Sequence, residues 1–473
     1  MGTKNGYVSF VGAGPGDMGL VTQKCLDRLN KADVILYDRL ANPRLLRHAK
    51  DTCEFIYCGK LPDRHTLRQE KINEQIIYHA LSGKYVVRLK GGDPSIFGRV
   101  GEEAEAVSNY NIPFEIVPGV TSSVAAAAYA GIPVTHRDYS NCFTIRTGHR
   151  SDKNCMYDAK SENLGDTIAY YMGVKNIEVN CRQLMDEGKD PDTPVAVIEW
   201  ATLGKQRVAV ATLKTISDTI AKEGIKNPAM TIVGDVVKLR SKLSWFEKQE
   251  FFNKKVLIVD DTSTGQEIEA YFSNKGAEAY TIPTILKKEL VLSKEKIEEI
   301  ISSEQLVFST AETVTSFLQQ LVKNDYTTWE LPRKLGFVEE CASTVLSQVG
   351  LKGRKEIESK SSASILQTKP VGSISGGTSN IYYIHELVQD NRFTEVNERM
   401  LREEDWNTVI FTTETSVDFY LNERKRLGLE YQSTPFAYIG ESVKEYANAR
   451  GVLSIDQSIQ SELCNYCIRC EKE

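Results

Sequence analysis

The 473-residue sequence has no long apolar run, no excess of basic residues and only four tryptophans. Its most apolar stretch, Val120–Val134, is short and is interrupted by Gly131 and Pro133, so it cannot span a bilayer. The formal net charge of −6 argues against a broad nucleic-acid-binding surface. No charged and apolar leader precedes the first predicted strand at Val8–Val11, so we expect a cytoplasmic protein.

The cysteines do not form the dense, regular pattern of a disulfide framework. Ten of them are scattered along the chain, which favours reduced cytoplasmic thiols. Only Cys464, Cys467 and Cys470 are clustered, and three thiols at this spacing can hold a metal ion, but no fourth ligand is evident. We therefore predict free thiols in a frayed C-terminal segment and no metal site.

Length and pattern indicate several α/β folding units. Hydrophobic residues make up 41% of the chain, so cores of normal size can form without a structural metal. Short β-type runs alternate with helical patterns, which indicates layers with largely parallel sheets. We assign strands to Tyr7–Val11, Val34–Tyr37, Tyr85–Leu89, Phe114–Val117, Thr193–Ile198 and Met230–Val233.

A charged and aromatic segment, 239–255, divides the chain into two modules. The part before it is rich in Gly-Pro loops, and the part after it is rich in Ser, Thr, Glu and Lys. We predict domains at 1–247 and 254–473 with a linker at 248–253. Within the second domain, 307–314 resembles 410–417, each a strand that ends in hydroxyl residues. This repeat predicts two similar α/β lobes, although N-capping of helices alone also explains the hydroxyls.

The segment Gly12–Asp17 follows the first predicted strand and resembles a dinucleotide-binding turn, with Asp38 about 20 residues later as the ribose ligand. Asp17 argues against this interpretation because it replaces the third glycine and would place a carboxylate beside a pyrophosphate. A nicotinamide-dependent enzyme is therefore the weaker alternative, and a ligand without phosphates fits better.

A second cluster, Arg88–Arg99, combines Gly91 and Gly92 with the carboxylate of Asp93 and several cations. The glycines let backbone approach a ligand closely, the carboxylate suits an amine or hydroxyls, and the cations suit carboxylates. A tight turn on a basic surface is the alternative. Met172, which follows a further strand region, is by itself most simply a core residue.

Taken together, these motifs resemble the uroporphyrinogen-III C-methyltransferases of the tetrapyrrole methylase family over about residues 5–246. The matching elements occur in order at Gly12–Asp17, Tyr37–Leu40, Gly59-Lys60, His65, Gln69, Ile72-Asn73, Val87–Arg99, Pro118–Ser122, Gly131–Asp138, Thr147–His149, Tyr171–Gly173 and Asn227–Val233.

The resemblance implies two α/β lobes, about 1–118 and 119–247, and S-adenosylmethionine-dependent methylation of uroporphyrinogen III, twice, to precorrin-2. It assigns Asp38 as proton acceptor and Lys60 as proton donor, and it implies a homodimer and a place in sirohaem or cobalamin biosynthesis. It implies cofactor binding by Pro15, Gly91, Gly92, Asp93, Ile96, Thr121, Ser122, Met172, Ala201 and Ala229. Ala201 stands where the family usually has glycine. From residue type and loop position, the candidates for binding substrate carboxylates are Arg88, Lys90, Arg99, His136, Arg137 and Arg146.

From about residue 254 the chain resembles uroporphyrinogen-III synthase, with two flavodoxin-like lobes at about 254–284 plus 404–473 and 285–403. This resemblance implies cyclisation of hydroxymethylbilane to uroporphyrinogen III. The chain departs from the family at Asp260-Asp261, where Thr-Arg is common, and at Ala342 and Val443, where threonine is common. A non-catalytic binding module is the alternative for this half.

Overall fold

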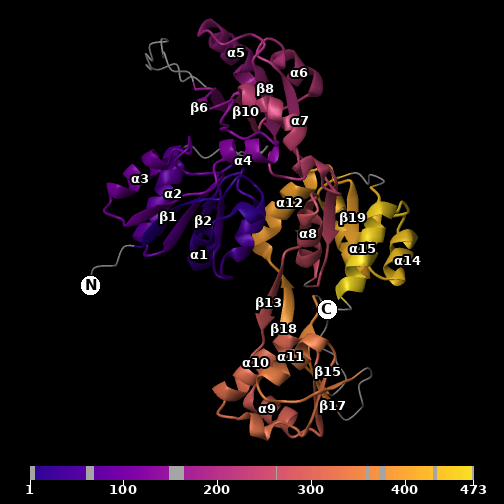
Figure 1. The fold of residues 1–473 in the computed structure, drawn as a ribbon. Coiled ribbons are helices and arrows are strands. Elements are labelled where there is room, and N and C mark those ends of the chain that lie inside the picture. Colours follow the sequence, from indigo (N-terminus) through magenta and orange to yellow (C-terminus); the bar gives the residue numbers. More distant parts are fainter. Residues whose placement is uncertain are drawn as a thin grey trace. The chain divides into compact units, whose positions relative to one another are not determined.

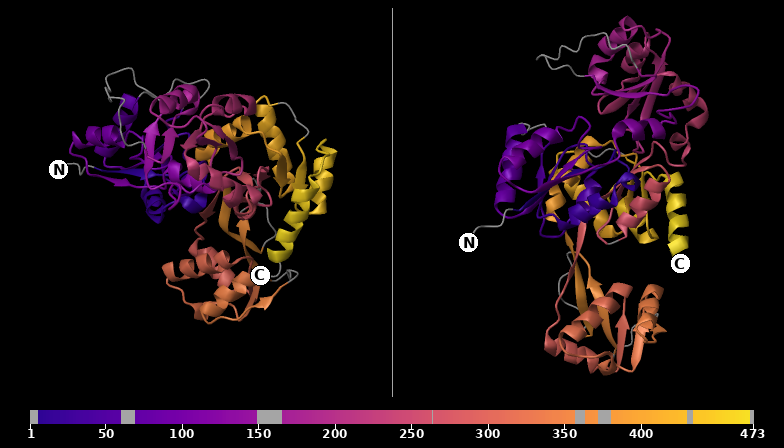
Figure 2. Two further views of the ribbon diagram at one scale, coloured as in Figure 1. Left: turned by 45° about the horizontal axis from the view of Figure 1, so that its top comes forward. Right: turned by 60° about the vertical axis from the view of Figure 1, so that its left-hand side comes forward.

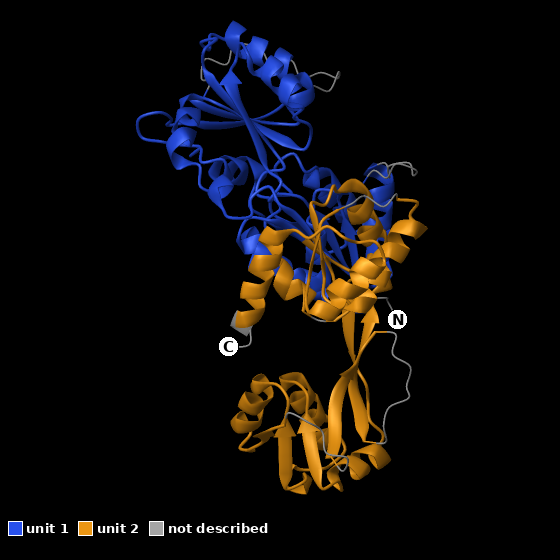
Figure 3. Cartoon of the chain, turned by 90° about the vertical axis from the view of Figure 1, so that its right-hand side faces the viewer, with its two compact units in different colours: residues 1–256, 270–279 blue, residues 257–269, 280–473 orange. Residues whose placement is uncertain are grey.

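The computed structural model describes residues 6–59, 69–148, 165–262, 264–356, 363–371, 380–429 and 434–470. Its strands and helices confirm the predicted α/β class, and the six predicted strands are found to within one residue (Figure 1). The chain divides into two compact units, Met1–Val256 with Ala270–Ala279 and Leu257–Glu269 with Tyr280–Glu473 (Figure 3). Over the described ranges, no helix combines the length and apolar character needed to cross a membrane.

A five-stranded parallel sheet begins the first unit, in the strand order β3-β2-β4-β1-β5. Its strands are β1 (Tyr7–Gly12), β2 (Val34–Tyr37), β3 (Glu54–Tyr57), β4 (Tyr85–Lys90) and β5 (Phe114–Val117). Its helices are α1 (Gln23–Lys31), α2 (Gln69–Leu81) and α3 (Val100–Ser108). Apolar residues of α2 and α3 pack on the sheet face that carries Val8, Phe10 and Val86. Because side chains alternate along a strand, Arg88 and Lys90 share this face with Val86.

A mixed sheet of order β6-β7-β10-β8-β9 completes the first unit, with β6 and β7 parallel and the other pairs antiparallel. Its strands are β6 (Phe143–Thr147), β7 (Thr167–Tyr171), β8 (Pro194–Glu199), β9 (Arg207–Thr212) and β10 (Ala229–Val233), and its helices are α4 (Ser122–Tyr129), α5 (Ile177–Asp186), α6 (Ile216–Glu223) and α7 (Arg240–Leu243). The alanines Ala126 and Ala127 of α4 are fully buried against Ile232, since small side chains allow close packing. Within the predicted linker, Phe251 is buried and its ring contacts Phe272.

Two further sheets, both seen in Figures 1 and 2, have the orders β12-β11-β19-β20 and β13-β18-β17-β14-β15-β16. Their strands are β11 (Lys255–Val259), β12 (Glu278–Ile282), β13 (Ile285–Glu289), β14 (Gln305–Phe308), β15 (Lys334–Phe337), β16 (Arg354–Lys355), β17 (Ala363–Lys369), β18 (Ile381–Gln389), β19 (Thr408–Phe411) and β20 (Phe436–Tyr438). The helices are α8 (Gly265–Asn274), α9 (Lys294–Ile301), α10 (Ala311–Lys323), α11 (Glu340–Gln348), α12 (Thr394–Glu403), α13 (Glu414–Arg426), α14 (Glu441–Ala449) and α15 (Gln457–Cys470).

The two copies of the sequence repeat form the same local structure. Thr310 caps α10 and Thr413 caps α13, each in a capping box that follows a buried strand. The prediction of a frayed C-terminal segment was wrong, because helix α15 extends to Cys470. Ile459 and Leu463 are buried on this helix, and their burial stabilises it.

Candidate functional site

The carboxyl ends of β1, β4 and β5 lie at one edge of the first sheet, and each strand continues into a glycine-containing turn. Gly14 and Gly92 exchange backbone hydrogen bonds, with Gly92 N donating to Gly14 O at 2.7 Å and Gly14 N donating to Gly92 O at 3.2 Å. A Cβ atom on Gly119 would lie 2.4 Å from the carbonyl oxygen of Gly92, so this contact requires glycine. Three turns that are distant in sequence therefore meet backbone to backbone.

Asp93 connects two of these turns. Its Oδ1 accepts a hydrogen bond from Ser95 N at 2.7 Å, and its Oδ2 accepts one from Gly119 N at 3.1 Å. The side chain is partly exposed, and a carboxylate has about four lone-pair sites. Asp93 can therefore hold the turns after β4 and β5 together and still accept a hydrogen bond from a ligand.

The turn after β2 brings Asp38 to the same edge. Arg88 Nη2 donates to Asp38 Oδ1 at 2.6 Å, and the Asp38 side chain keeps 32% of its exposure. Two residues along, Leu40 lies against Gly91, and Asn42 Nδ2 donates to Gly16 O at 2.7 Å. A carboxylate with one fixed oxygen and access to solvent thus lies beside the glycine turns.

Side chains of the second lobe and of α4 connect to these turns. The hydroxyl groups of Tyr171 and Thr121 are 2.5 Å apart, and Phe97 packs on the Tyr171 ring with 5.3 Å between centroids. Tyr129 donates its hydroxyl to Asp17 Oδ2 at 2.6 Å, and burial together with this carboxylate raises the pKa of Tyr129. Asp17 also accepts from Gly19 N, so its carboxylate caps a short helix rather than facing an open pyrophosphate site.

Several turns after strands of the first unit contain non-glycine residues with positive φ. These residues are Phe97 and Arg99 after β4, Met172 after β7, and Trp200 and Thr202 after β8. Such residues cost free energy and cluster at ligand sites when the surrounding structure holds them. Met172 is 51% exposed, so the alternative that it fills the core is wrong. Ala201 lies between the two strained residues Trp200 and Thr202.

The ten predicted cofactor-binding residues all lie in turns or at element ends of the first unit. All of them except Gly92 are partly or fully exposed, so their surfaces are accessible to a ligand. Lys60, the predicted proton donor, lies outside the described residues, as do the motif residues His65 and His149.

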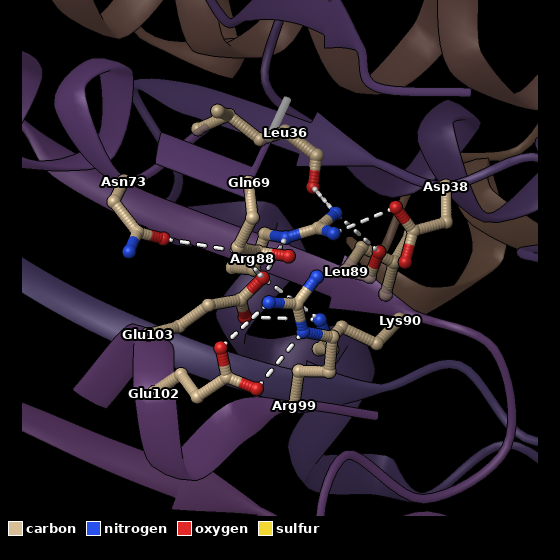
Figure 4. A network of polar contacts seen from close by, with 10 residues as sticks. All are labelled: Leu36, Asp38, Gln69, Asn73, Arg88, Leu89, Lys90, Arg99, Glu102 and Glu103. Atoms are coloured by element: carbon tan, nitrogen blue, oxygen red, sulfur yellow. Dashed lines mark hydrogen bonds and ion pairs between the residues drawn. The ribbon is translucent and has the colours of Figure 1, made fainter. Parts of the chain in front are cut away.

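The six predicted substrate cations do not share one environment. The side chains of Arg88 and Lys90 are buried and contact Glu103, a placement that does not fit their predicted role as substrate ligands (Figure 4). The other four are at least partly exposed. Arg99 pairs with Glu102, Arg146 pairs with Glu187, His136 Nδ1 accepts from Asp138 N, and Arg137 is exposed.

Glu103, Tyr129 and Tyr171 were not predicted as site residues, although Tyr171 begins the matching motif Tyr171–Gly173. A signal for Glu103 is present, because Val100, Glu103, Ala104 and Val107 follow the spacing of one helix face. A charged residue at a buried position of that face indicates a buried partner. The two tyrosines carry no such local signal, since their partners are far away in sequence.

Comparison with known proteins gives consistent matches. Residues 7–217 match the family described as Tetrapyrrole (Corrin/Porphyrin) Methylases. A Bacillus subtilis (strain 168) protein named uroporphyrinogen-III C-methyltransferase is 39% identical over 432 residues, covering 90% of this chain and 89% of its own length. A second protein of that name and organism is 51% identical over 247 residues, covering 52% of this chain and 96% of its own length. The solved uroporphyrin-III C-methyl transferase of Thermus thermophilus, complexed with S-adenyl homocysteine, is 36% identical, covers 50% of this chain and 100% of its own, and has a TM-score of 0.43.

Proposed function

Because the chain belongs to the tetrapyrrole methylase family, we propose that it methylates uroporphyrinogen III on carbon with S-adenosylmethionine as the methyl donor. Two successive transfers give precorrin-2 through precorrin-1, a precursor for sirohaem or cobalamin. The Bacillus subtilis protein named uroporphyrinogen-III C-methyltransferase, which aligns with 90% of this chain, supports the assignment. The observation that carries it is the convergence of Asp38 with the three glycine turns at one sheet edge. Ligands of open α/β sheets bind at this edge.

The residues present fit the proposed cofactor. Gly91 and Gly92 lack side chains where the turn after β4 is partly exposed. Pro15 lies in the turn after β1 and Ser122 follows the turn after β5, and these residues and Met172 have accessible surface. With Asp93, Ile96, Thr121, Ala201 and Ala229, these residues would hold the cofactor. S-Adenosylmethionine, when bound, supplies an electrophilic methyl group on a sulfonium sulfur. The strained turns fix the positions of these residues, and alignment of the two reactants is the main requirement of methyl transfer.

Asp38 supplies the chemistry that the substrate requires. An electron-rich pyrrole ring becomes positively charged when one of its carbons gains a methyl group, and a nearby carboxylate can stabilise that charge or accept the N–H proton. Arg88 fixes one oxygen of Asp38, so the other oxygen is free to face the pyrrole. Lys60 is retained as the proposed proton donor on the basis of the family resemblance. Arg99, His136, Arg137 and Arg146 are the proposed contacts to substrate carboxylates.

We also propose that residues 254–473 form the second module and cyclise hydroxymethylbilane to uroporphyrinogen III. The matched capping boxes at Thr310 and Thr413 place hydroxyl groups and helix N-termini after buried strands, which suits a polyanionic substrate. A non-catalytic binding module is the second candidate, and one observation favours it. Asp260 and Asp261 accept hydrogen bonds from the hydroxyls of Thr412 and Thr413, so protein carboxylates already occupy these donors.

The test uses the full chain under anaerobic conditions. With preformed uroporphyrinogen III and S-adenosylmethionine, we expect precorrin-2, and with S-adenosylhomocysteine we expect calorimetric binding that NAD(P) does not show. Tight NAD(P) binding without S-adenosylhomocysteine binding would favour a nicotinamide-dependent enzyme instead. With hydroxymethylbilane, the type III isomer supports the synthase activity. The type I isomer, which forms without assistance, supports the binding module.

The same proposal includes three further points: a domain boundary at 248–253, a homodimer formed through the methyltransferase domain, and a cytoplasmic location. A fragment of residues 1–247 that folds and methylates uroporphyrinogen III would support the partition, because each half is long enough to bury its own core. Sedimentation of the full chain measures the oligomeric state.

A further inference from the structure

Helix α3 carries a carboxylate on its apolar face. Val100, Ala104 and Val107 of this helix are buried against the first sheet, and Glu103, on the same face, has a relative exposure of 0%. Burial of an ionised side chain costs free energy unless neighbouring groups satisfy it. Glu103 therefore depends on donors supplied by other elements.

Three side chains from β4 and α2 supply those donors (Figure 4). Lys90 Nζ donates to both Glu103 oxygens at 2.9 Å, and Arg88 Nε donates to Oε1 at 3.2 Å. Gln69 Nε2 also donates to Oε1, at 3.0 Å, and to Asn73 Oδ1 at 3.1 Å. Glu103 is thus held by four hydrogen bonds without contact with solvent.

Arg88 joins this buried carboxylate to Asp38. Its Nε bonds to Glu103, and its Nη2 bonds to Asp38 Oδ1 at 2.6 Å. The guanidinium group is planar and rigid, so the position of Nε determines the direction of Nη2. A lysine at position 88 would be a point charge and could not hold both carboxylates in this geometry. The orientation of Asp38 is therefore coupled to Glu103.

We propose that Glu103 is a positioning residue for methylation, which acts through Arg88 to hold Asp38 in one orientation. This role rests on the proposed methyltransferase function. Two cations, Arg88 and Lys90, balance two carboxylates, Glu103 and Asp38, so removal of one carboxylate leaves excess positive charge beside the other. A cluster that only stabilises the fold is the rival explanation, and buried ion pairs contribute little to stability on average.

The charged and titratable groups around Asp38 come from β4, α3 and the end of β3. Arg88 and Lys90 come from β4, Glu103 from α3, and the buried thiol of Cys58 follows β3. Burial raises the pKa of Cys58 to about 11, so this thiol stays neutral at the assay pH. Loss of the Glu103 charge leaves both cations facing Asp38, and Arg88 Nε loses the carboxylate that fixes the direction of its guanidinium group.

The experiment compares Glu103→Gln with Glu105→Gln in the full chain. Glu105 lies on the same helix but is exposed, so its substitution makes the same charge change away from the cluster. We expect Glu103→Gln to lower turnover of uroporphyrinogen III by at least about 10-fold, part of the roughly 10²-fold that a proton-transfer group contributes. Affinity for S-adenosylhomocysteine should be unchanged. In an Asp38→Asn background, Glu103→Gln should alter turnover by less than about 2-fold, because coupled residues are not additive.

Equal turnover of the two variants would overturn the role of Glu103. An equal loss of turnover from Glu103→Gln in the parent and in the Asp38→Asn background would also overturn it, because a purely structural cluster gives that outcome. If Glu103→Gln is insoluble, the double variant Glu103→Gln/Lys90→Met replaces it, because this variant removes one buried charge of each sign. It is measured alone and in the Asp38→Asn background, and the same loss of turnover is expected. An inactive parent chain would instead refute the proposed function, and the role of Glu103 with it.

Discussion

The strand ends in the two units are occupied by different groups. In the first unit, glycine turns after β1, β4 and β5 leave partly exposed surface, and Asp38 has one oxygen held by Arg88. In the second unit, Asp260 is 2% exposed and accepts hydrogen bonds from Thr262, Thr412 and Gly265 N at 2.6–2.8 Å. The strand ends near Asp38 therefore keep hydrogen-bond acceptors and accessible surface for a ligand. At the strand ends of the second unit, the Asp260 carboxylate already accepts the hydrogen bonds of the neighbouring donors.

This difference shows that the α/β layering does not by itself determine a site. Both regions have buried strands that end in turns and capped helices, and both carry aspartates at the strand ends. The difference lies in the partner of each aspartate. Asp38 is bound by the buried cation Arg88, whereas Asp260 is bound by hydroxyl groups and a backbone N–H group. Function has to be assigned from such partners rather than from the fold.

The largest expected effect comes from Asp38→Asn. The amide keeps the shape of the side chain but loses the charge that stabilises a methylated pyrrole, so we expect turnover to fall by about 10²-fold or more. Binding of S-adenosylhomocysteine should stay normal. Steady-state kinetics measure the change, with Asp27→Asn on the exposed side of α1 as the control. Near-normal turnover would make Asp38 a structural residue at a strand end.

Asp93→Ala tests whether the glycine turns of the first unit bind the cofactor. The substitution removes the acceptor for Ser95 N and Gly119 N and a carboxylate available to a ligand. Loss of a charged hydrogen bond of about 1.5–3 kcal/mol corresponds to roughly 10- to 150-fold weaker binding of S-adenosylhomocysteine. Calorimetry checks this, and unchanged affinity would contradict it. Asp51→Ala, at an exposed position in the turn before β3, is the control.

Asp260→Ala should affect stability and leave methylation unchanged. The variant removes an acceptor from Thr262, Thr412 and Gly265 N. The two hydroxyls keep Thr264 and Val259 O as partners, but the buried Gly265 N loses its acceptor, and an unsatisfied buried group costs about 1–3 kcal/mol. Denaturant unfolding of the full chain should show this loss, whereas Asp405→Ala, which is exposed, should not. A fall in methylation rate with intact folding would show that the two edges are not functionally separate.

The smallest effect concerns Glu115 on β5. Burial alone would raise the pKa of Glu115, but hydrogen bonds from Arg28, Lys24 and Ser9 lower it to about 2 from its ordinary value of 4.5. A lowered carboxylate pKa stabilises the folded state above pH 4.5, and this contribution is lost as the pH falls toward 2. Because Glu115 is partly exposed, we expect this contribution to the free energy of unfolding to be about 1 kcal/mol. The difference in unfolding free energy between the parent and Glu115→Gln should shrink over this range, and a constant difference would contradict the account.

Sequence reasoning located the strands and the turns because these depend on local patterns. Runs of β-branched residues and glycine positions predict β1, β2, β4 and β5 without tertiary information. The partners of Arg88 and Lys90 could not be predicted in this way. A cation at a strand end can face a ligand or a buried carboxylate, and packing of α3 on the sheet decides between them. For the same reason the sequence showed only that Asp260-Asp261 departs from the synthase family, whereas the structure shows the donors that surround Asp260.

The most direct test of the account is product identification with three full-length chains: the parent, Asp38→Asn and Asp260→Ala. Each is incubated anaerobically with uroporphyrinogen III and S-adenosylmethionine, and the products are resolved by mass and absorbance. We expect precorrin-2 from the parent and from Asp260→Ala at similar rates, and from Asp38→Asn at a rate at least about 10²-fold lower. Methylation that survives in Asp38→Asn but is lost in a folded Asp260→Ala chain would contradict it.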